Sequence, residues 1–226
     1  MLSNLLRKFN GYIVSMEDEM VHDIDELPEN FEVYHDIIKC LVGALEAKDL
    51  YTRGHSNRVG DMAYELAKHI GIKGEELNTI HIAGHLHDIG KIGVPDKILN
   101  KKGKLSESEW KAIKRHPEIG SNILNCSSKL KVISKLVLHH HERWDGKGYP
   151  WGLKGKDIPL GSRIIALCDS IDAMTSQRPY RKPIPWEICK MEIRNNKGVQ
   201  FDPFLVEAME GLWENWEQKF YGRQVQ

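Results

Sequence analysis

The sequence predicts an all-α fold, a helical bundle whose helices are joined by long loops rich in glycine and proline. Several segments repeat apolar residues at intervals of three and four, which is the pattern of an amphipathic helix. No segment alternates apolar and polar residues as a half-buried strand does. Glycine and proline gather between the periodic segments, at residues 93–106 and 142–162, so we expect loops there.

The chain is expected to contain one main domain. Residues 1–30 are polar and acidic and are assigned to a lead-in or linker, and residues 31–220 are assigned to the domain. The first helix of that domain covers the apolar stripe from Phe31 to Leu45. We assign this stripe to the core, with a dimer-forming helix as the alternative.

Further helices follow from the same periodicity and from local end signals. Ser106 and Glu109 form the S-x-x-E pattern of a capping box, which starts a helix. Pro117 is expected to break the direction of the chain, because the residue before a proline avoids the helical region. The other helices are expected at residues 59–70, 75–88, 133–141, 161–175, 187–195 and 203–216.

Composition excludes several classes of protein. The 226 residues include 32 Lys and Arg against 32 Asp and Glu, and this balance argues against a protein that coats DNA or a membrane surface. No apolar run approaches the roughly 20 residues of a membrane helix, and we expect no secretory signal. The four cysteines contain no C-x-x-C pair, as in a reducing compartment. We therefore expect a cytoplasmic protein without a DNA or membrane partner.

Histidine is the unusual residue, with eleven in the chain. His140 and His141 end an apolar stripe, where each imidazole nitrogen needs a polar partner. Asp169 and Asp172 lie about one turn apart on an apolar helix face, where a carboxylate is costly unless it is paired or bound to a metal. Similar residues recur at other expected helix ends, and together they predict a polynuclear metal centre. The set is His55, His87, Asp88, His116, His140, His141, Asp169 and Asp172.

Other polar residues are assigned ordinary roles. His81 and His85 lie four residues apart, a spacing that can bind a metal, but the sequence shows no third ligand for them. Glu142 is assigned to a helix end or to the support of a ligand rather than to a catalytic base. The histidines assigned to the surface or to ordinary helix positions are His22, His35, His69, His81, His85 and His139.

Six sequence strings follow one another between residues 35 and 215. They are DLYTRGHSNRV (49–59), HLHDIGKIGVPDKIL (85–99), RHPEIG (115–120), HHERWDGKGYPWGL (140–153), RIIALCDSIDAMTSQRPYR (163–181) and GVQFDP (198–203). In content and order they closely resemble the HD-GYP domain of the HD superfamily of metal-dependent phosphohydrolases. The resemblance covers nearly the whole chain, and it implies the helical bundle of that superfamily around a metal centre.

The resemblance implies hydrolysis of cyclic di-GMP to linear pGpG, to GMP, or to both. Two divalent ions, iron or manganese, would share a hydroxide that attacks phosphorus, with Asp88 bridging the ions. Some members carry a glutamate four residues before the first histidine, where it supports a third metal. Tyr51 stands there in this chain, which favours two metals. The implied ligands are His55, His87, Asp88, His116, His140, His141 and Asp169.

Further roles are implied position by position. Lys91 matches the family lysine near the scissile phosphate, so it is assigned a catalytic role together with Asp88. Tyr149 belongs to the Gly-Tyr-Pro signature, with a packing role as the alternative. The residues expected to bind substrate are Lys91, Tyr149, Arg178 and Arg181. We also expect Asp145 and Asp172 to accept hydrogen bonds from ligand histidines.

Alternatives to cyclic di-GMP hydrolysis stay open. The substrate could be another cyclic dinucleotide, such as cyclic GMP-AMP, or a related nucleotide phosphate ester. The chain could also be an inactive module that binds a cyclic dinucleotide or acts as a scaffold, although all seven ligand positions are present. The open partners are a second copy of this chain, a diguanylate cyclase and a response regulator, and the chain could be a fragment of a longer protein.

Overall fold

The computed structural model describes residues 29–49, 54–176 and 182–221, and these residues form helices and loops but no strand. The chain divides into two compact units, residues 1–39 and 40–226. The described part of the first unit is the beginning of helix α2, and all other elements belong to the second unit. The predicted all-α class is therefore confirmed.

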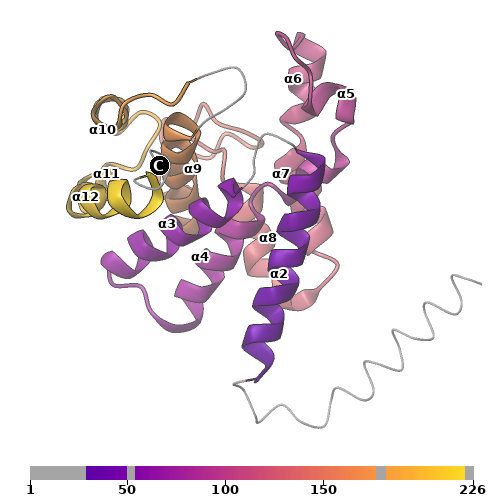
Figure 1. Cartoon of the computed structure of the whole chain (residues 1–226), viewed down its shortest axis with the longest axis horizontal. Coiled ribbons are helices and arrows are strands. Elements are labelled where there is room, and N and C mark those ends of the chain that lie inside the picture. Colours follow the sequence, from indigo (N-terminus) through magenta and orange to yellow (C-terminus); the bar gives the residue numbers. More distant parts are fainter. Residues whose placement is uncertain (1–28, 50–53, 177–181, 222–226) are drawn as a thin grey trace, which may run out of the picture. The chain divides into compact units, whose positions relative to one another are not determined.

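Short helices make up most of the second unit (Figure 1). The α-helices of the described chain are α2 (Glu29–Lys48), α3 (His55–His69), α4 (Gly74–Leu86), α5 (Asp96–Leu99), α6 (Glu107–Ile113), α7 (His116–Leu124), α8 (Lys131–Leu138), α9 (Leu160–Thr175), α10 (Trp186–Asn195), α11 (Pro203–Ala208) and α12 (Trp213–Trp216). The 3-10 helices are η1 (Ile89–Gly93), η2 (Ser128–Leu130), η3 (Gly155–Asp157) and η4 (Met209–Leu212), and a π-helical turn, η5 (Glu217–Tyr221), follows α12.

The core lies between four helices. α3 packs along α4 and α9, and α4 also packs against α8. The apolar face of α3 is completely buried at Met62 and Leu66, and that of α9 at Ile164 and Ile171. Burial of such side chains is the main favourable contribution to folding. This core holds the N-terminus of α3, the C-termini of α4 and α8 and the middle of α9 in fixed positions.

The predicted helices agree with the structure in their interiors and differ at their ends. The stripe over residues 59–70 is the buried face of α3. The helix expected over residues 203–216 is divided into α11, η4 and α12. α8 ends at Leu138, so residues 139–141 form a turn rather than one more helical step. Tertiary contacts determine these ends, and apolar periodicity does not report them.

Two end signals have different outcomes. The capping box is confirmed, because Ser106 Oγ accepts from Glu109 N at 3.2 Å and Glu109 Oε2 accepts from Ser106 N at 2.7 Å. The break expected at Pro117 lies just before it, in the turn between α6 and α7, but His116 already belongs to α7 and Pro117 lies in the first turn of that helix. A proline fits there because the first amides of a helix need no intrahelical acceptor.

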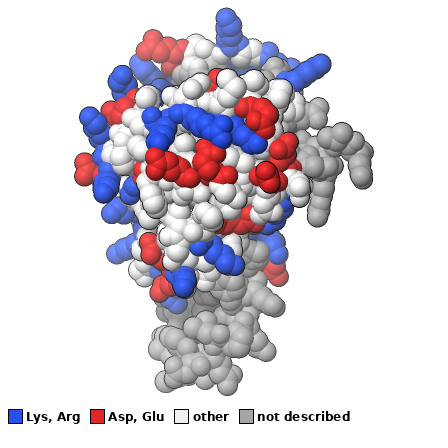
Figure 2. Space-filling view, turned by 90° about the vertical axis from the view of Figure 1, so that its left-hand side faces the viewer, with Lys and Arg blue, Asp and Glu red and all other residues white. Residues whose placement is uncertain are grey.

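On the face shown in Figure 2, Lys and Arg side chains lie beside Asp and Glu side chains. Among the C-terminal helices, Arg194 pairs with Glu210 at 2.6 Å and Lys197 pairs with Glu207 at 2.5 Å. Among the described helices, none combines the length and the apolar character that crossing a bilayer demands.

Gly90 is required by a close approach between η1 and α7. A Cβ atom at this position would lie 1.9 Å from the carbonyl oxygen of His116 and 2.4 Å from the backbone nitrogen of Gly120. Both neighbours are backbone atoms, so they cannot move aside as a side chain can. This contact sets the distance between the residues that follow α4 and the start of α7.

We expect Gly90→Ala to lower the free energy of unfolding by about 3 kcal/mol or more, because the added methyl group overpacks rigid backbone. The midpoint of urea unfolding measures this change. Gly103→Ala is the matched control, since a Cβ atom there meets nothing within 4 Å. Equal midpoints for the two variants would contradict the close-packing argument.

Candidate metal centre

Two clusters of metal-binding side chains lie on either side of Asp88. His55 at the start of α3, His87 after α4 and Asp169 in α9 form one cluster. The other contains His116, His140 and His141. Within each cluster the ligand atoms lie within 4.8 Å of one another. The structure thus brings together all seven residues expected as metal ligands.

The carboxylate of Asp88 faces both clusters. Its Oδ2 atom lies 3.7 Å from His55 Nε2 and 3.4 Å from His87 Nε2, whereas its Oδ1 atom lies 3.3 Å from His116 Nε2. One carboxylate can coordinate two neighbouring cations through its two oxygens. The position of Asp88 therefore fits a bridge between two ions, one at each cluster.

Backbone carbonyls fix the orientation of three ligand rings. In each, Nδ1 donates to the carbonyl oxygen three residues earlier, at 2.7 Å for His87, 2.8 Å for His116 and 2.6 Å for His140. These carbonyls lie in the last turns of α4, α6 and α8, respectively. Because a carbonyl oxygen only accepts, the hydrogen must be on Nδ1, and in the neutral ring Nε2 keeps a lone pair for a metal.

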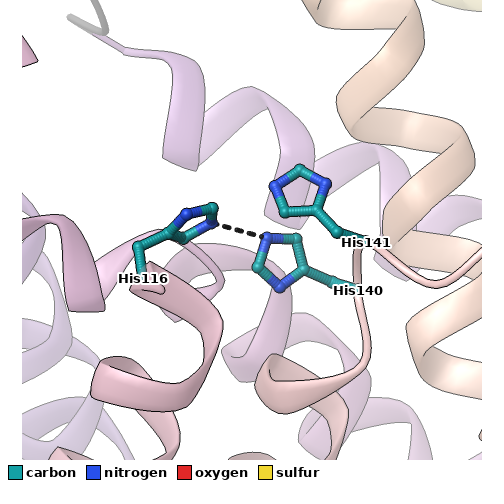
Figure 3. Close-up of side chains that lie close together, drawn as sticks. All are labelled: His116, His140 and His141. Carbon is teal, nitrogen blue, oxygen red and sulfur yellow. Dashed lines mark hydrogen bonds between the residues drawn. The ribbon is translucent and has the colours of Figure 1, made fainter. Parts of the chain in front are cut away.

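His116, at the start of α7, and His140 and His141, in the turn after α8, turn their rings toward one another (Figure 3). Nε2 of His116 and Nε2 of His140 are 3.2 Å apart. Burial lowers the pKa of both rings, and burial together with the nearby His116 lowers the pKa of His141 to about 3. Because His116 and His140 carry their hydrogens on Nδ1, their two Nε2 lone pairs face each other. A cation would convert this repulsion into coordination.

His55 is held by carboxylates instead of a carbonyl. Its Nδ1 donates to Asp172 Oδ2 at 2.6 Å, and its Nε2 lies 3.3 Å from Asp169 Oδ1. Burial opposes a charge on the ring, but the two carboxylates outweigh it and raise the pKa of His55 to about 9. Without a metal, His55 is therefore an imidazolium at neutral pH. Its Nε2 proton must leave before this nitrogen can bind a metal.

Arg58 supports this arrangement from the next turn of α3. It donates to Asp172 from Nε at 2.5 Å and from Nη2 at 3.1 Å. Although burial opposes the charge of Asp172, its bonds with His55 and Arg58 hold the pKa of the carboxyl below its usual value. Sequence reasoning missed Arg58, although its position three residues after His55 places both side chains on one helix face.

Lys91 places a positively charged ammonium group beside Asp88. Its Nζ atom lies 2.7 Å from Asp88 Oδ2 and 3.2 Å from Asp49 Oδ2. Burial would lower the pKa of this amine, but the two carboxylates raise it above its ordinary value, so the side chain is an ammonium. Sequence reasoning missed Asp49, which is 3% exposed, although it begins the string DLYTRGHSNRV.

The Gly-Tyr-Pro loop is closed against the turn that carries His141. A Cβ atom on Gly148 would lie 2.4 Å from Arg143 N and 2.6 Å from His141 O, so only glycine fits there without displacing the backbone. Tyr149 follows and packs its ring against His141, with ring centroids 4.8 Å apart. Glu142 accepts from the backbone nitrogen of Trp151 at 2.8 Å, which fastens the far end of the loop.

One expected role needs correction. Asp145 does not support a ligand histidine, because its carboxylate accepts from Arg143 Nη2 at 2.9 Å and from the backbone nitrogen of Lys147 at 3.0 Å. The short spacing between these residues favours local pairing in the loop. Tyr51, Arg178 and Arg181, which were expected near the third metal position and the substrate phosphate, lie outside the described residues.

The side chains present fit divalent metal ions. His87 Nε2 is buried and makes no hydrogen bond among the described residues, although it faces the carboxylate of Asp88. The pKa values of Asp88 and Asp169 are held well below their usual range despite burial, so both are anions. A mixed set of neutral imidazoles and carboxylates suits borderline and hard transition-metal ions. The two clusters can therefore hold metals.

Metal binding is expected to release about one proton per chain from His55 below pH 9, because this ring is charged in the metal-free protein. Affinity at that cluster should then rise about tenfold per pH unit up to pH 9. Isothermal titration calorimetry at pH 7, in buffers of different ionisation enthalpy, measures the release. Heats that do not depend on the buffer would contradict the charge assigned to His55.

Asp172→Asn is expected to weaken metal binding by about tenfold or more, because His55 loses the charged acceptor that orients its ring. Competition with a chromophoric chelator at pH 9 measures the affinity where protonation of His55 interferes least. Asp157→Asn, at an exposed position, is the control and should bind metal as the wild type does. Equal affinities in the two variants would exclude an orienting role for Asp172.

Comparison with known sequences matches the HD domain family over residues 39–205. A cyclic di-GMP phosphodiesterase of Thermotoga maritima is 39% identical over 88% of this chain and 56% of its own length. A 3′3′-cGAMP-specific phosphodiesterase of Vibrio cholerae is also 39% identical, over 83% of this chain and 36% of the relative. The chain thus spans between about a third and just over a half of these curated relatives.

Solved structures show the same fold. A cyclic GMP-AMP specific phosphodiesterase of V. cholerae aligns with 83% of this chain and 51% of its own, at a TM-score of 0.60 and 21% identity. An HD-GYP-type protein of Bdellovibrio bacteriovorus aligns with 71% of this chain and 51% of its own, at a TM-score of 0.58 and 17% identity. The family match over residues 39–205 and the 39% identity with the Thermotoga relative show that the chain belongs to the HD domain family.

Proposed function

We propose that this chain is a metal-dependent phosphodiesterase that hydrolyses cyclic di-GMP, with two divalent ions, iron or manganese, at the clusters beside Asp88. The observation that carries the proposal is the position of the Asp88 carboxylate, whose oxygens face one cluster each while Lys91 Nζ lies 2.7 Å away. The name of the Thermotoga relative supports the choice of substrate.

The bound ions supply Lewis acidity for the phosphoryl oxygens and for water. The chain's own groups define the surroundings. The ammonium of Lys91 is a fixed positive charge that stabilises charge developing on a phosphoryl oxygen. Its raised pKa makes it a source of electrostatic stabilisation rather than a proton donor at neutral pH. Tyr149 keeps its phenolic proton, because burial and the nearby carboxylates raise its pKa, so it can donate a hydrogen bond to substrate.

The overall reaction adds one water across one phosphodiester bond. The P–O3′ bond breaks, the hydroxyl of water joins phosphorus and its proton goes to the 3′ oxygen, which gives linear pGpG. A second hydrolysis of the same kind gives GMP. Arg178 and Arg181 remain proposed contacts of the substrate phosphates, and the ions and Lys91 provide the positive charge that an anionic dinucleotide requires.

Cyclic GMP-AMP is the second candidate substrate. The Vibrio relative named for this nucleotide is as similar to the chain, at 39% identity, as the Thermotoga relative. Both nucleotides present the same pair of phosphodiesters to the metal centre, so selectivity must come from contacts with the bases. An inactive scaffold is less consistent with two clusters of three potential ligand residues on either side of Asp88.

The domain and location follow the same proposal. Residues 31–220 are proposed to form the catalytic domain, with residues 1–30 as a linker. We propose that the chain acts in the cytoplasm, where cyclic dinucleotides are made and read. A second copy of the chain stays a proposed partner.

Asp88→Asn is expected to lower kcat/KM for cyclic di-GMP by about 10³-fold or more, because the bridge between the clusters loses its charge. The assay follows pGpG and GMP by chromatography, with Mn²⁺ in air and with Fe²⁺ under anaerobic conditions. Cyclic GMP-AMP is run in parallel. Asp96→Asn removes an exposed carboxylate from the neighbouring helix and should leave the rate unchanged.

The outcomes separate the alternatives. Hydrolysis of cyclic GMP-AMP but not of cyclic di-GMP replaces the first substrate by the second. Binding of either nucleotide without turnover under both metals selects the scaffold. An Asp88→Asn variant that hydrolyses as fast as the wild type would remove the metal mechanism altogether.

A further inference from the structure

A third group of potential ligands lies between α3 and α4, outside the two clusters beside Asp88. It consists of Asp61 from α3 and His81 and His85 from α4. His81 Nε2 lies 3.2 Å from Asp61 Oδ1 and 3.0 Å from His85 Nε2. The two histidines were assigned ordinary roles because no third ligand was evident in the sequence. The fold supplies Asp61 as that ligand.

The group lies where α3 and α4 approach most closely. A Cβ atom on Gly84 would lie 2.8 Å from the Cα atom of Gly60, and one on Gly60 would lie 2.8 Å from the ring of His85. Two glycines therefore let the helices approach closely enough for the His85 ring to lie over the backbone of α3. The same approach places Asp61, the next residue on α3, beside His81.

His81 Nε2 cannot form a good hydrogen bond with both Asp61 and His85. Nε2 of a neutral imidazole is either one donor or one acceptor. This atom nevertheless faces a carboxylate oxygen at 3.2 Å and another imidazole nitrogen at 3.0 Å. A single hydrogen can be well aligned with only one of them. A cation placed among the three atoms would satisfy all three lone pairs at once.

The distances match the edges of a coordination shell. With metal–nitrogen bonds of about 2.0–2.1 Å, neighbouring ligand atoms are about 2.9 Å apart in an octahedral shell and about 3.3 Å apart in a tetrahedral one. The observed 3.0 and 3.2 Å lie between these values. The side chain of Asp61 is 48% exposed and that of His81 is 18% exposed, so a hydrated ion can reach the group from solvent.

We propose that Asp61, His81 and His85 form a third metal site, which takes a borderline divalent transition-metal ion such as Zn²⁺. Two imidazoles and one carboxylate from the protein leave at least one coordination position for water. The ion would link α3 to α4 across their glycine contact, and it would stabilise the folded chain because the unfolded chain lacks the preformed site.

The site is independent of the centre proposed for hydrolysis. His85 lies in the last turn of α4 and His87 is the residue that caps it, with helical backbone angles, so the two side chains point about 200° apart around the helix axis. His81 and His85 share one face, as residues four apart do. Loss of the third site should therefore reduce metal content without abolishing hydrolysis.

The experiment counts metal ions on the full chain. Metal-free protein is titrated with Zn²⁺ against a chromophoric chelator, and bound zinc is checked by elemental analysis after gel filtration. We expect His81→Gln and Asp61→Ala each to bind one equivalent less than the wild type. His69→Gln, an exposed histidine on α3, is the matched control and should bind as many equivalents as the wild type. Zinc should also raise the Tm of the wild type more than that of either variant.

The possible outcomes test the third metal site separately from the proposed hydrolysis of cyclic dinucleotides. Unchanged zinc stoichiometry in Asp61→Ala overturns the third site, and this variant truncates a side chain that is only half-buried, so the result holds even if His81→Gln folds poorly. Asp88→Asn should lose hydrolysis and keep zinc at the third site. A chain that hydrolyses no cyclic dinucleotide but shows the one-equivalent difference retains the third site while the proposed function fails.

Discussion

The buried carboxylate of Asp88 is the constraint on which the rest of the site depends. It is 4% exposed, and removing such a charge from water is costly unless positive or polar partners surround it. Lys91, His87 and His116 provide these partners within the protein, and metal ions would provide stronger ones. The partners come from η1, the end of α4 and the start of α7, so the bundle must bring these segments together before the charge can be buried.

Helix ends do much of the positioning. The last carbonyls of a helix lack intrahelical partners, and here three of them accept from imidazoles of the candidate metal centre. One hydrogen bond thus satisfies an orphan carbonyl and sets the tautomer of a ligand. This explains why His87 and His140 follow the ends of α4 and α8 instead of lying within them. The proposed third site is built differently, from two positions within α4 and one within α3.

Sequence reasoning predicted the helical class from local signals, and the family resemblance together with such signals pointed to the seven residues that the fold brings together at Asp88. Apolar periodicity marks a helix, and histidines beside carboxylates mark a metal site. It missed Asp49, Arg58 and Asp61, whose partners lie 20 or more residues away in the chain. Such contacts depend on how helices cross. Asp145 was assigned wrongly for the opposite reason, since a loop arginine two residues away pairs with it first.

The hydrogen bond from His140 to Val137 has a consequence for how the candidate metal centre responds to heating. Terminal helix turns fray at lower free energies than global unfolding. When the last turn of α8 opens, the acceptor of His140 Nδ1 moves with it, so the ligand loses its orientation while the core remains folded. Amide exchange at the end of α8 would then report a local opening that disorders the His116, His140 and His141 cluster before the bundle melts.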